Sequence, residues 1–173
     1  KAVLQSNRDI KQTILTFAWK FWKKGTRVLF KKEKRVITFN SETTFTLDNE
    51  TKTSKWIQSI IESEGFEVLE INYVFCDDIY LNKINVEFLN HDTFTDIISF
   101  DYSLGNQIGG DIYISVERVR ENAENFNVTF ENELHRVLIH GVLHYMGFKD
   151  KTEKDKTEMR NKEESCLLSL NSW

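Results

Sequence analysis

The sequence predicts an α/β fold of the α+β type, in which one small mixed sheet of about four strands packs against about five helices. Four short runs rich in β-branched and aromatic residues precede Ser115, whereas the chain after Ser115 has a helical pattern almost to its end. With 173 residues, 40% of them hydrophobic, the chain is long enough for one sizeable core and too short for two domains to be expected. Strands followed by helices in this order favour helices packed against one sheet.

The first 35 residues differ from the rest of the chain in charge. Lys1–Arg35 carries 11 Lys and Arg against 2 Asp and Glu, a net charge of +9, whereas residues 36–173 carry −13. Four apolar residues recur there at helical spacing: Ile10, Ile14, Phe17 and Phe21. The segment is either a basic amphipathic arm for a membrane, a ribosome or the protein itself, or an extension without a function of its own. The first residue is not Met and the composition changes abruptly at Val36, which favours an extension, 1–35, before one domain, 36–173.

Within the domain we expect strands and helices in a defined order. The strands are VITFN at 36–40, FEVLEINYVFC at 66–76, TDIISFDY at 95–102 and GGDIYIS at 109–115. Helices are expected at 55–64, 116–125, 130–146 and 154–170. A further helix, capped by Asp77, is expected to turn Leu81, Ile84 and Phe88 inward.

The sequence also indicates the cellular compartment in which the protein is expected. No apolar run approaches the roughly 18 residues that span a bilayer, and no secretory signal pattern occurs. We therefore expect a soluble, cytoplasmic protein with no membrane partner. Cys76 and Cys166 lie far apart without a C-x-x-C pairing, so two buried thiols are expected in place of a disulfide or a metal site.

The stretch HGVLHYMGFKD, residues 140–150, is the candidate functional motif. Residues four apart stack on one helical face about 5 to 6 Å apart, so His140 and His144 can reach one metal ion. They share a polar stripe with Glu133 and Arg136, beside a separate apolar stripe. The alternative is an ordinary helix with two hydrogen-bonded histidines.

The residues after His144 favour the metal site. Gly147 is suited to end the helix in a left-handed conformation, after which a short loop can return the carboxylate of Asp150 to the two imidazoles. Three protein ligands would leave a fourth position of Zn²⁺ for water, which is typical of catalytic sites. The metalloprotease pattern H-E-x-x-H requires a glutamate where this chain has Gly141, so peptide hydrolysis by that mechanism is disfavoured.

The motif resembles the signature H-G-x-L-H-x-x-G-Y-D-H of the bacterial rRNA maturation factor and endoribonuclease family YbeY, whose three histidines bind zinc. Phe148 takes the place of the tyrosine and Asp150 that of the third histidine. Upstream, NVEFLNHDTFTDIISFDY from Asn85 is similar to the family segment N-x-x-Y-R-x-x-D-x-P-T-D-V-L-S-F, and GGDIYIS to its G-D-I strand. The resemblance covers roughly Val36 to Leu170.

The resemblance implies a zincin-like metal site on the C-terminal helices and a zinc-dependent, single-strand-specific endoribonuclease. It further implies a role in 3′-end maturation of small-subunit 16S rRNA and in ribosome quality control, with rRNA and the small ribosomal subunit and its proteins as partners. Two rivals stay open: a non-catalytic ribosome assembly factor stabilised by its metal, and a metal-dependent hydrolase of another substrate.

Three departures from the family pattern bear on the substrate site. Leu89 stands where the family usually has an arginine linked to RNA, Phe94 replaces a proline, and Arg136 replaces a histidine found in many members. Our hypothesis is that Arg136, one turn before His140, supplies the charge that Leu89 cannot, as a catalytic and RNA-binding residue. His91 is a second candidate for substrate binding, although a hydrogen-bonded structural histidine is the plainer interpretation.

The sequence does not single out a general base or a basic RNA surface. Glu133, Asp92 and Asp96 are candidates for the base, and His135 falls off the ligand stripe. The charge of −13 on the domain repels RNA overall. Binding therefore has to rely on the metal, on a local patch such as Arg118, Arg120 and Arg136, on the basic arm, or on recruitment by ribosomal proteins.

Overall fold

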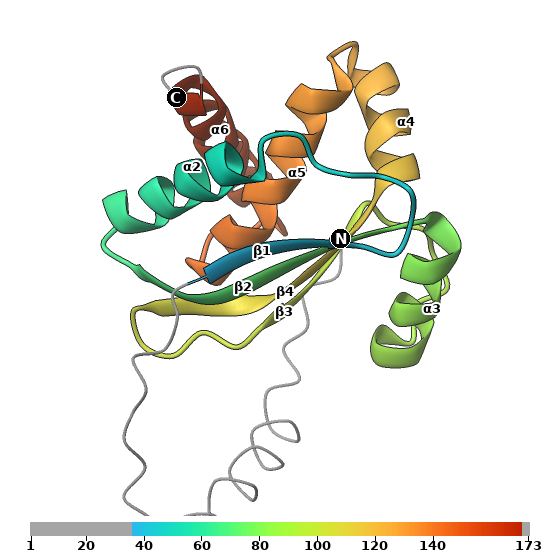
Figure 1. Ribbon diagram of the computed structural model, residues 1–173, viewed down its shortest axis with the longest axis horizontal. Helices are drawn as coiled ribbons and strands as arrows, with labels where there is room; N and C mark the ends of the chain where they lie inside the picture. The colour runs from blue at the N-terminus through green and yellow to red at the C-terminus, as the bar shows by residue number, and fades with distance from the viewer. Residues whose placement is uncertain (1–35, 171–173) are drawn as a thin grey trace, which may run out of the picture.

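The computed structural model describes residues 36–170, apart from the side chain of Leu89. The expected arm or extension at 1–35 lies outside the described residues. The described chain forms a mixed four-stranded sheet with five helices, as the sequence predicts (Figure 1). Among these residues, no helix is both long and apolar enough to span a bilayer.

The strands are β1 (Val36–Ser41), β2 (Glu67–Cys76), β3 (Ile97–Asp101) and β4 (Gln107–Ser115). They lie in the order β1-β2-β4-β3. β1 and β4 both run parallel to β2, while β3 pairs antiparallel with β4 at the edge. Gly105, with a left-handed φ of 63°, allows the tight turn between β3 and β4, whereas the parallel pairs need helical crossovers.

The helices are α2 (Glu50–Ser63), α3 (Asp78–Leu89), α4 (Val116–Phe126), α5 (Phe130–Tyr145) and α6 (Glu153–Leu170). Three of them start at the side-chain caps that these residue types favour. The side chains of Asp77, Ser115 and Thr129 accept hydrogen bonds from the backbone amides of Tyr80, Arg118 and Asn132. The predicted cap at Asp77 is confirmed.

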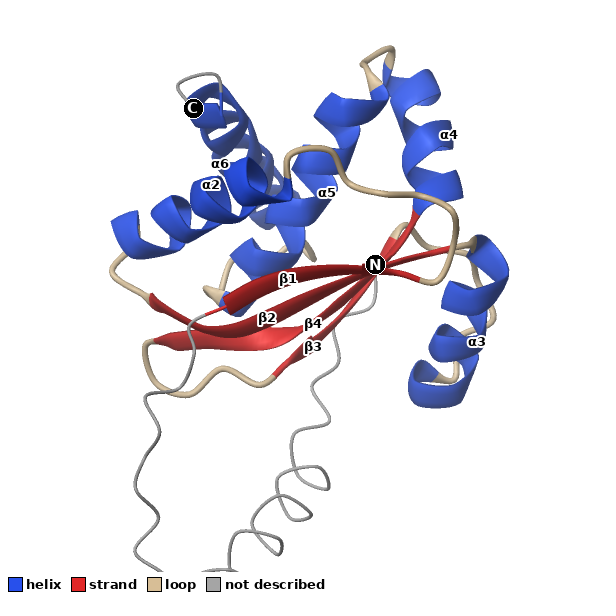
Figure 2. Ribbon diagram, in the orientation of Figure 1, coloured by secondary structure: helices blue, strands red, loops and turns tan. Residues whose placement is uncertain are grey.

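The main core lies on one face of the sheet, beneath α2, α5 and α6 (Figure 2). Alternate residues of β2 and β4 point into it, including Ile71, Tyr73 and Ile112, because successive side chains of a strand face opposite sides. Trp56 of α2 is fully buried and donates a hydrogen bond from Nε1 to the carbonyl oxygen of Cys166, 3.1 Å away. This contact fixes α6 against α2.

Among residues 36–170, α3 is the helix that packs on the other face of the sheet, and it covers that face only in part. A small cluster of Cys76, Leu81 and Ile98 lies there, with Ile84 packed at its edge. The expectation that Phe88 points inward is wrong, because the ring is 53% exposed. The cluster is too small to enclose a residue so near the end of α3, and the ring of Phe88 packs edge to face with that of Phe100 at the margin of the cluster.

Both cysteines are buried, as the sequence predicts. Burial raises the pKa of Cys76 to about 12 and that of Cys166 to about 11. Thiols that stay protonated at neutral pH are poor nucleophiles and poor metal ligands, so packing is sufficient to explain both residues.

Candidate metal centre

The C-terminal half of α5 presents both histidines of the motif. His140 and His144 lie one turn apart, and their side chains are 2% and 8% exposed. The neighbouring face of the helix is apolar and packs on the sheet, so the sheet holds the two imidazoles in place. Their rings meet edge to face, with 4.5 Å between centroids.

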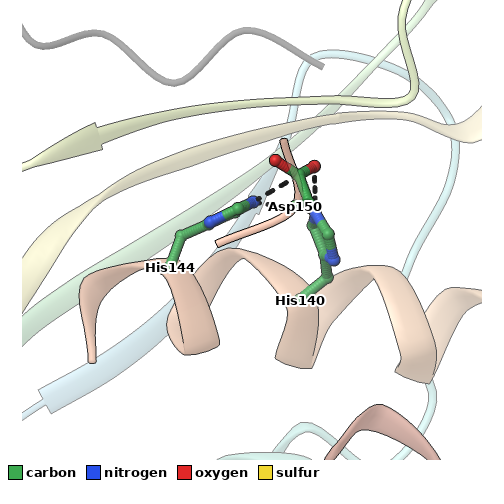
Figure 3. Close-up of side chains that lie close together, drawn as sticks. All are labelled: His140, His144 and Asp150. Atoms are coloured by element: carbon green, nitrogen blue, oxygen red, sulfur yellow. Dashed lines mark hydrogen bonds and ion pairs between the residues drawn. The ribbon is translucent and has the colours of Figure 1, made fainter. Parts of the chain in front are cut away.

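Gly147 ends the helix and turns the chain back, as the sequence predicts. Its φ of 95° is a left-handed conformation that side-chain-bearing residues rarely adopt. The amide of Phe148 donates to the carbonyl oxygen of Leu143 over 3.1 Å, and the amide of Gly147 to that of His144 over 3.0 Å. This pattern closes the helix end and directs the loop towards α6, which brings Asp150 above the two histidines (Figure 3).

Three ligand atoms converge at this point. Nε2 of His140 lies 3.0 Å from Nε2 of His144, and Oδ2 of Asp150 lies 3.9 Å and 3.8 Å from these two nitrogens. A circle through three atoms so spaced has a radius of about 2.1 Å, the distance that zinc takes from nitrogen and oxygen ligands. These residues form the one group of metal-ligand type found among the described residues.

The hydrogen bonds on the far side of each ring decide where its proton sits. Nδ1 of His144 lies 2.9 Å from the carbonyl oxygen of Phe148, which can only accept. Nδ1 of His140 lies 2.6 Å from Oε1 of Glu163, whose carboxylate has Arg136 as a counterion. Both partners accept, so each Nδ1 carries a proton, which leaves Nε2 of each neutral ring as the atom whose lone pair faces Asp150. Three acceptors facing one space suit a cation.

Glu163 is the residue that sequence reasoning missed. It lies on α6, 23 positions after His140, and its side chain is 3% exposed. The available signal was its place on the buried stripe of a helix that is otherwise strongly charged. Met159, Glu163 and Cys166 are the buried residues of α6, at spacings of four and three.

Arg136 lies one helical turn before His140, and its guanidinium forms ion pairs with carboxylates. Its Nε donates to Oε2 of Glu133 over 2.8 Å, and its NH2 group also bonds Glu133. Its NH1 lies 3.4 Å from Glu163. Burial alone would lower the pKa of Arg136, but these carboxylates raise it above its ordinary value. The guanidinium is charged and largely neutralised, so its expected role towards RNA stays a prediction.

The other residues singled out in the sequence lie apart from the three ligand atoms. His91 is exposed in the loop after α3, and Asp92 accepts a hydrogen bond from Asn82. Asp96 lies 3.8 Å from Arg136 and accepts a hydrogen bond from Asn122. His135 packs edge to face on Trp56, away from the pair, as its position off the ligand stripe predicts. The structure leaves the general base unassigned.

A pocket of about 430 Å³ opens beside Asp150. Lys156 and Arg160 of α6 line it, with side chains 55% and 51% exposed, together with Arg136. In the predicted patch, Arg118 and Arg136 pair with the carboxylates of Asp78 and Glu133, while Arg120 is exposed and stacks over Phe130. Lys156 and Arg160 also pair with carboxylates, those of Glu153 and Glu164, but both side chains stay half exposed beside Asp150. Accessible positive charge next to the candidate ligands comes from Lys156 and Arg160 of α6 and from the exposed Lys149 and Lys151, which flank Asp150 in the loop.

Comparisons with known proteins indicate the family of the chain. Residues 36–171 match the family described as Endoribonuclease YbeY. The chain is 61% identical over 132 residues to Endoribonuclease YbeY of Flavobacterium johnsoniae, which covers 76% of this chain and 95% of that protein. It is 45% identical over 137 residues to Endoribonuclease YbeY of Cytophaga hutchinsonii, covering 79% of this chain and 96% of the relative.

A solved structure supports the fold. The solution structure of TM1509 from Thermotoga maritima superposes with a TM-score of 0.58 at 27% sequence identity. The match covers 78% of this chain and 89% of the other. The overall fold of the chain therefore resembles that of an experimental structure.

Proposed function

Because the chain belongs to the endoribonuclease YbeY family, we propose that it is a metal-dependent endoribonuclease that cleaves single-stranded rRNA. We further propose zinc as the metal, with His140, His144 and Asp150 as its protein ligands and water in the fourth position. The observation that carries this proposal is the convergence of two Nε2 lone pairs and one carboxylate oxygen within 3.9 Å of one another.

The residues around the site have different proposed roles in metal binding and in RNA binding. The chemistry that a zinc ion supplies in such a site is an acidified water and a polarised phosphodiester oxygen. His140 and His144 hold the ion as neutral ligands, and Asp150 adds one negative charge, which leaves the site at +1. Lys156 and Arg160 are placed to hold backbone phosphates of the RNA in the pocket beside Asp150.

The biological setting is part of the proposal. We propose that the substrate is the 3′ end of the small-subunit 16S rRNA, in maturation and in ribosome quality control, and that the protein acts in the cytoplasm on the small ribosomal subunit. The acidic charge of the domain supports a role for ribosomal proteins in recruitment, because rRNA alone is repelled at long range.

The direct test is cleavage of a single-stranded RNA by the purified protein, with and without a chelator, beside His144→Ala. We expect the chelator and the substitution each to abolish cleavage, because both remove the metal. The proposal is wrong if the wild-type protein binds metal but leaves RNA intact, which would favour the assembly-factor alternative. Cleavage that persists in His144→Ala would point to a contaminating nuclease.

A further inference from the structure

A cluster of buried charges lies directly behind His140. It consists of Glu163 from α6, Glu133 and Arg136 from α5, and Asp96 from the loop before β3, and the first three of these side chains are at most 7% exposed. We propose that Glu163 is a positioning residue for the metal site, which fixes His140 as an Nε2 ligand, and that Arg136 holds Glu163 in place. This inference rests on the proposed function, since it concerns the same metal.

The first step is the hydrogen bond itself. Oε1 of Glu163 lies 2.6 Å from Nδ1 of His140, within the range of a charge-assisted bond. An ionised carboxylate only accepts, so it selects the imidazole with its proton on Nδ1 and leaves Nε2 as the ligand atom. A carboxylate partner also makes the imidazole more basic and therefore a stronger ligand.

The second step is the support of Glu163. The NH1 group of Arg136 lies 3.4 Å from both carboxylate oxygens of Glu163. Arg136 is itself held on its other edge by two hydrogen bonds to Glu133, so its guanidinium has little freedom to move. Because α5 carries Arg136 and His140 while α6 carries Glu163, the chain of contacts also ties α6 to the ligand helix.

The two histidines differ in a way that provides an internal comparison. Nδ1 of His144 is held by the backbone carbonyl of Phe148 at 2.9 Å, a partner that no side-chain substitution removes. Nδ1 of His140 is held by a side chain. Loss of Glu163 should therefore disturb His140 and leave the tautomer of His144 unchanged.

The experiment measures zinc affinity, by competition with a chromophoric chelator, for the wild type, Glu163→Ala, Glu163→Gln and Glu164→Ala. Loss of such an outer partner weakens metal binding roughly 10–100-fold, which we expect for Glu163→Ala. Glu163→Gln should lose less, because its amide oxygen can still accept from Nδ1. Glu164 is the matched control, since it is the adjacent carboxylate on α6, is 63% exposed and pairs with Arg160. Its variant should bind zinc as the wild type does.

Folded Glu163→Ala with zinc affinity within about twofold of the wild type would overturn the inference. The proposed function fails separately, if the wild type itself binds no zinc. Should Glu163→Ala not fold, long-range ¹H–¹⁵N NMR of the metal-free wild type decides instead. We expect its His140 to carry the proton on Nδ1 and Glu163→Gln to shift only the His140 signals. A proton on Nε2 of His140 in the wild type would contradict the inference.

A further variant, Arg136→Met, separates this role of Arg136 from its expected role towards RNA. In Arg136→Met, loss of the support for Glu163 should weaken zinc binding and shift the His140 signals in the absence of any RNA. If zinc affinity and the His140 signals stay unchanged and only RNA affinity falls, Arg136 is a substrate cation and not the support of Glu163.

Discussion

Gly141, between the two candidate ligands, lets α5 lie against the sheet. A Cβ at this position would meet Cδ1 of Ile112 at 2.9 Å and Cδ1 of Ile97 at 3.1 Å. The sequence pattern places this glycine on the core stripe of the helix, but only the packing shows why it carries no side chain. The close approach of α5 to the sheet also fixes how far the imidazoles of His140 and His144 lie from the sheet.

We therefore expect Gly141→Ala to destabilise the protein. Overpacking of a close contact costs about 1–3 kcal/mol, and the better helix propensity of alanine offsets up to about 1 kcal/mol of it. Urea unfolding of the metal-free protein measures the difference. A variant as stable as the wild type would show that the two isoleucines move aside freely.

His135 makes stability depend on pH without taking part in the site. Burial lowers its pKa below the ordinary value of 6.5, so the folded protein favours the neutral ring. The unfolded chain then binds more protons, and the contribution is present above about pH 6.5 and is lost as the pH falls below it. The free energy of unfolding of the wild type should fall more between pH 7.5 and 5.5 than that of His135→Gln. Equal slopes, measured with chelator present, would refute this.

Among individual residues, the sequence was sufficient for His140, His144, Gly147 and the return of Asp150, because all four depend on local helix geometry. Glu163 could not be predicted from the sequence, because its contact with His140 spans 23 positions and depends on how α6 packs. The neutralisation of Arg136 by Glu133 and Glu163 was hidden for the same reason.

At the scale of elements, the loop between α5 and α6 completes the candidate metal site. His140 and His144 lie before the loop, Asp150 lies within it, and α6 follows three positions later at Glu153. A metal that binds only the folded chain adds its binding energy to stability. Metal binding at this site should therefore stabilise the packing of α5 against α6.

Zinc should raise the melting temperature of the wild type and leave that of Asp150→Ala nearly unchanged. At a free concentration 100 times the dissociation constant, binding stabilises by about 2.7 kcal/mol, which corresponds to on the order of 10 °C for a domain of this size. Differential scanning fluorimetry with buffered zinc measures the shift. An equal shift in both proteins would place the bound ion elsewhere.

Element boundaries followed from local patterns with few errors. The helices expected at 116–125, 130–146 and 154–170 are found at Val116–Phe126, Phe130–Tyr145 and Glu153–Leu170. The helix expected at 55–64 begins earlier, at Glu50. The prediction missed this start because the first turn of the helix is polar and shows no apolar periodicity. Strand order and the exposure of Phe88 depend on tertiary packing, which no local pattern encodes.

For the whole molecule, the balance of charge limits how RNA can bind. Residues 36–173 carry a net −13, while the accessible cations beside the candidate metal site are few: Lys156 and Arg160 on α6 and Lys149 and Lys151 in the loop. Affinity should therefore come from a few local phosphate contacts and from the metal, with little long-range attraction. Such binding depends weakly on salt compared with that of strongly basic RNA-binding proteins.

Arg160→Ala should weaken the binding of single-stranded RNA and make it less sensitive to salt. One lost phosphate contact lowers the slope of log affinity against log salt by roughly 0.7 for a single strand. Fluorescence anisotropy in a cleavage-deficient His144→Ala background measures this slope. Lys83→Ala on α3, at the other face of the sheet, is the control and should bind as its parent does. An unchanged slope in Arg160→Ala would remove Arg160 from the RNA site.

The central claim is that His140, His144 and Asp150 together hold one catalytic metal ion. Calorimetric titration of the metal-free wild type, Asp150→Ala and Glu158→Ala with zinc tests it most directly, since Glu158 is an exposed carboxylate on α6 and serves as the control. We predict one site in the wild type and in Glu158→Ala. Asp150→Ala should lose more than the roughly 10–100-fold that an outer partner costs. Zinc binding of equal stoichiometry and affinity in Asp150→Ala would contradict the claim.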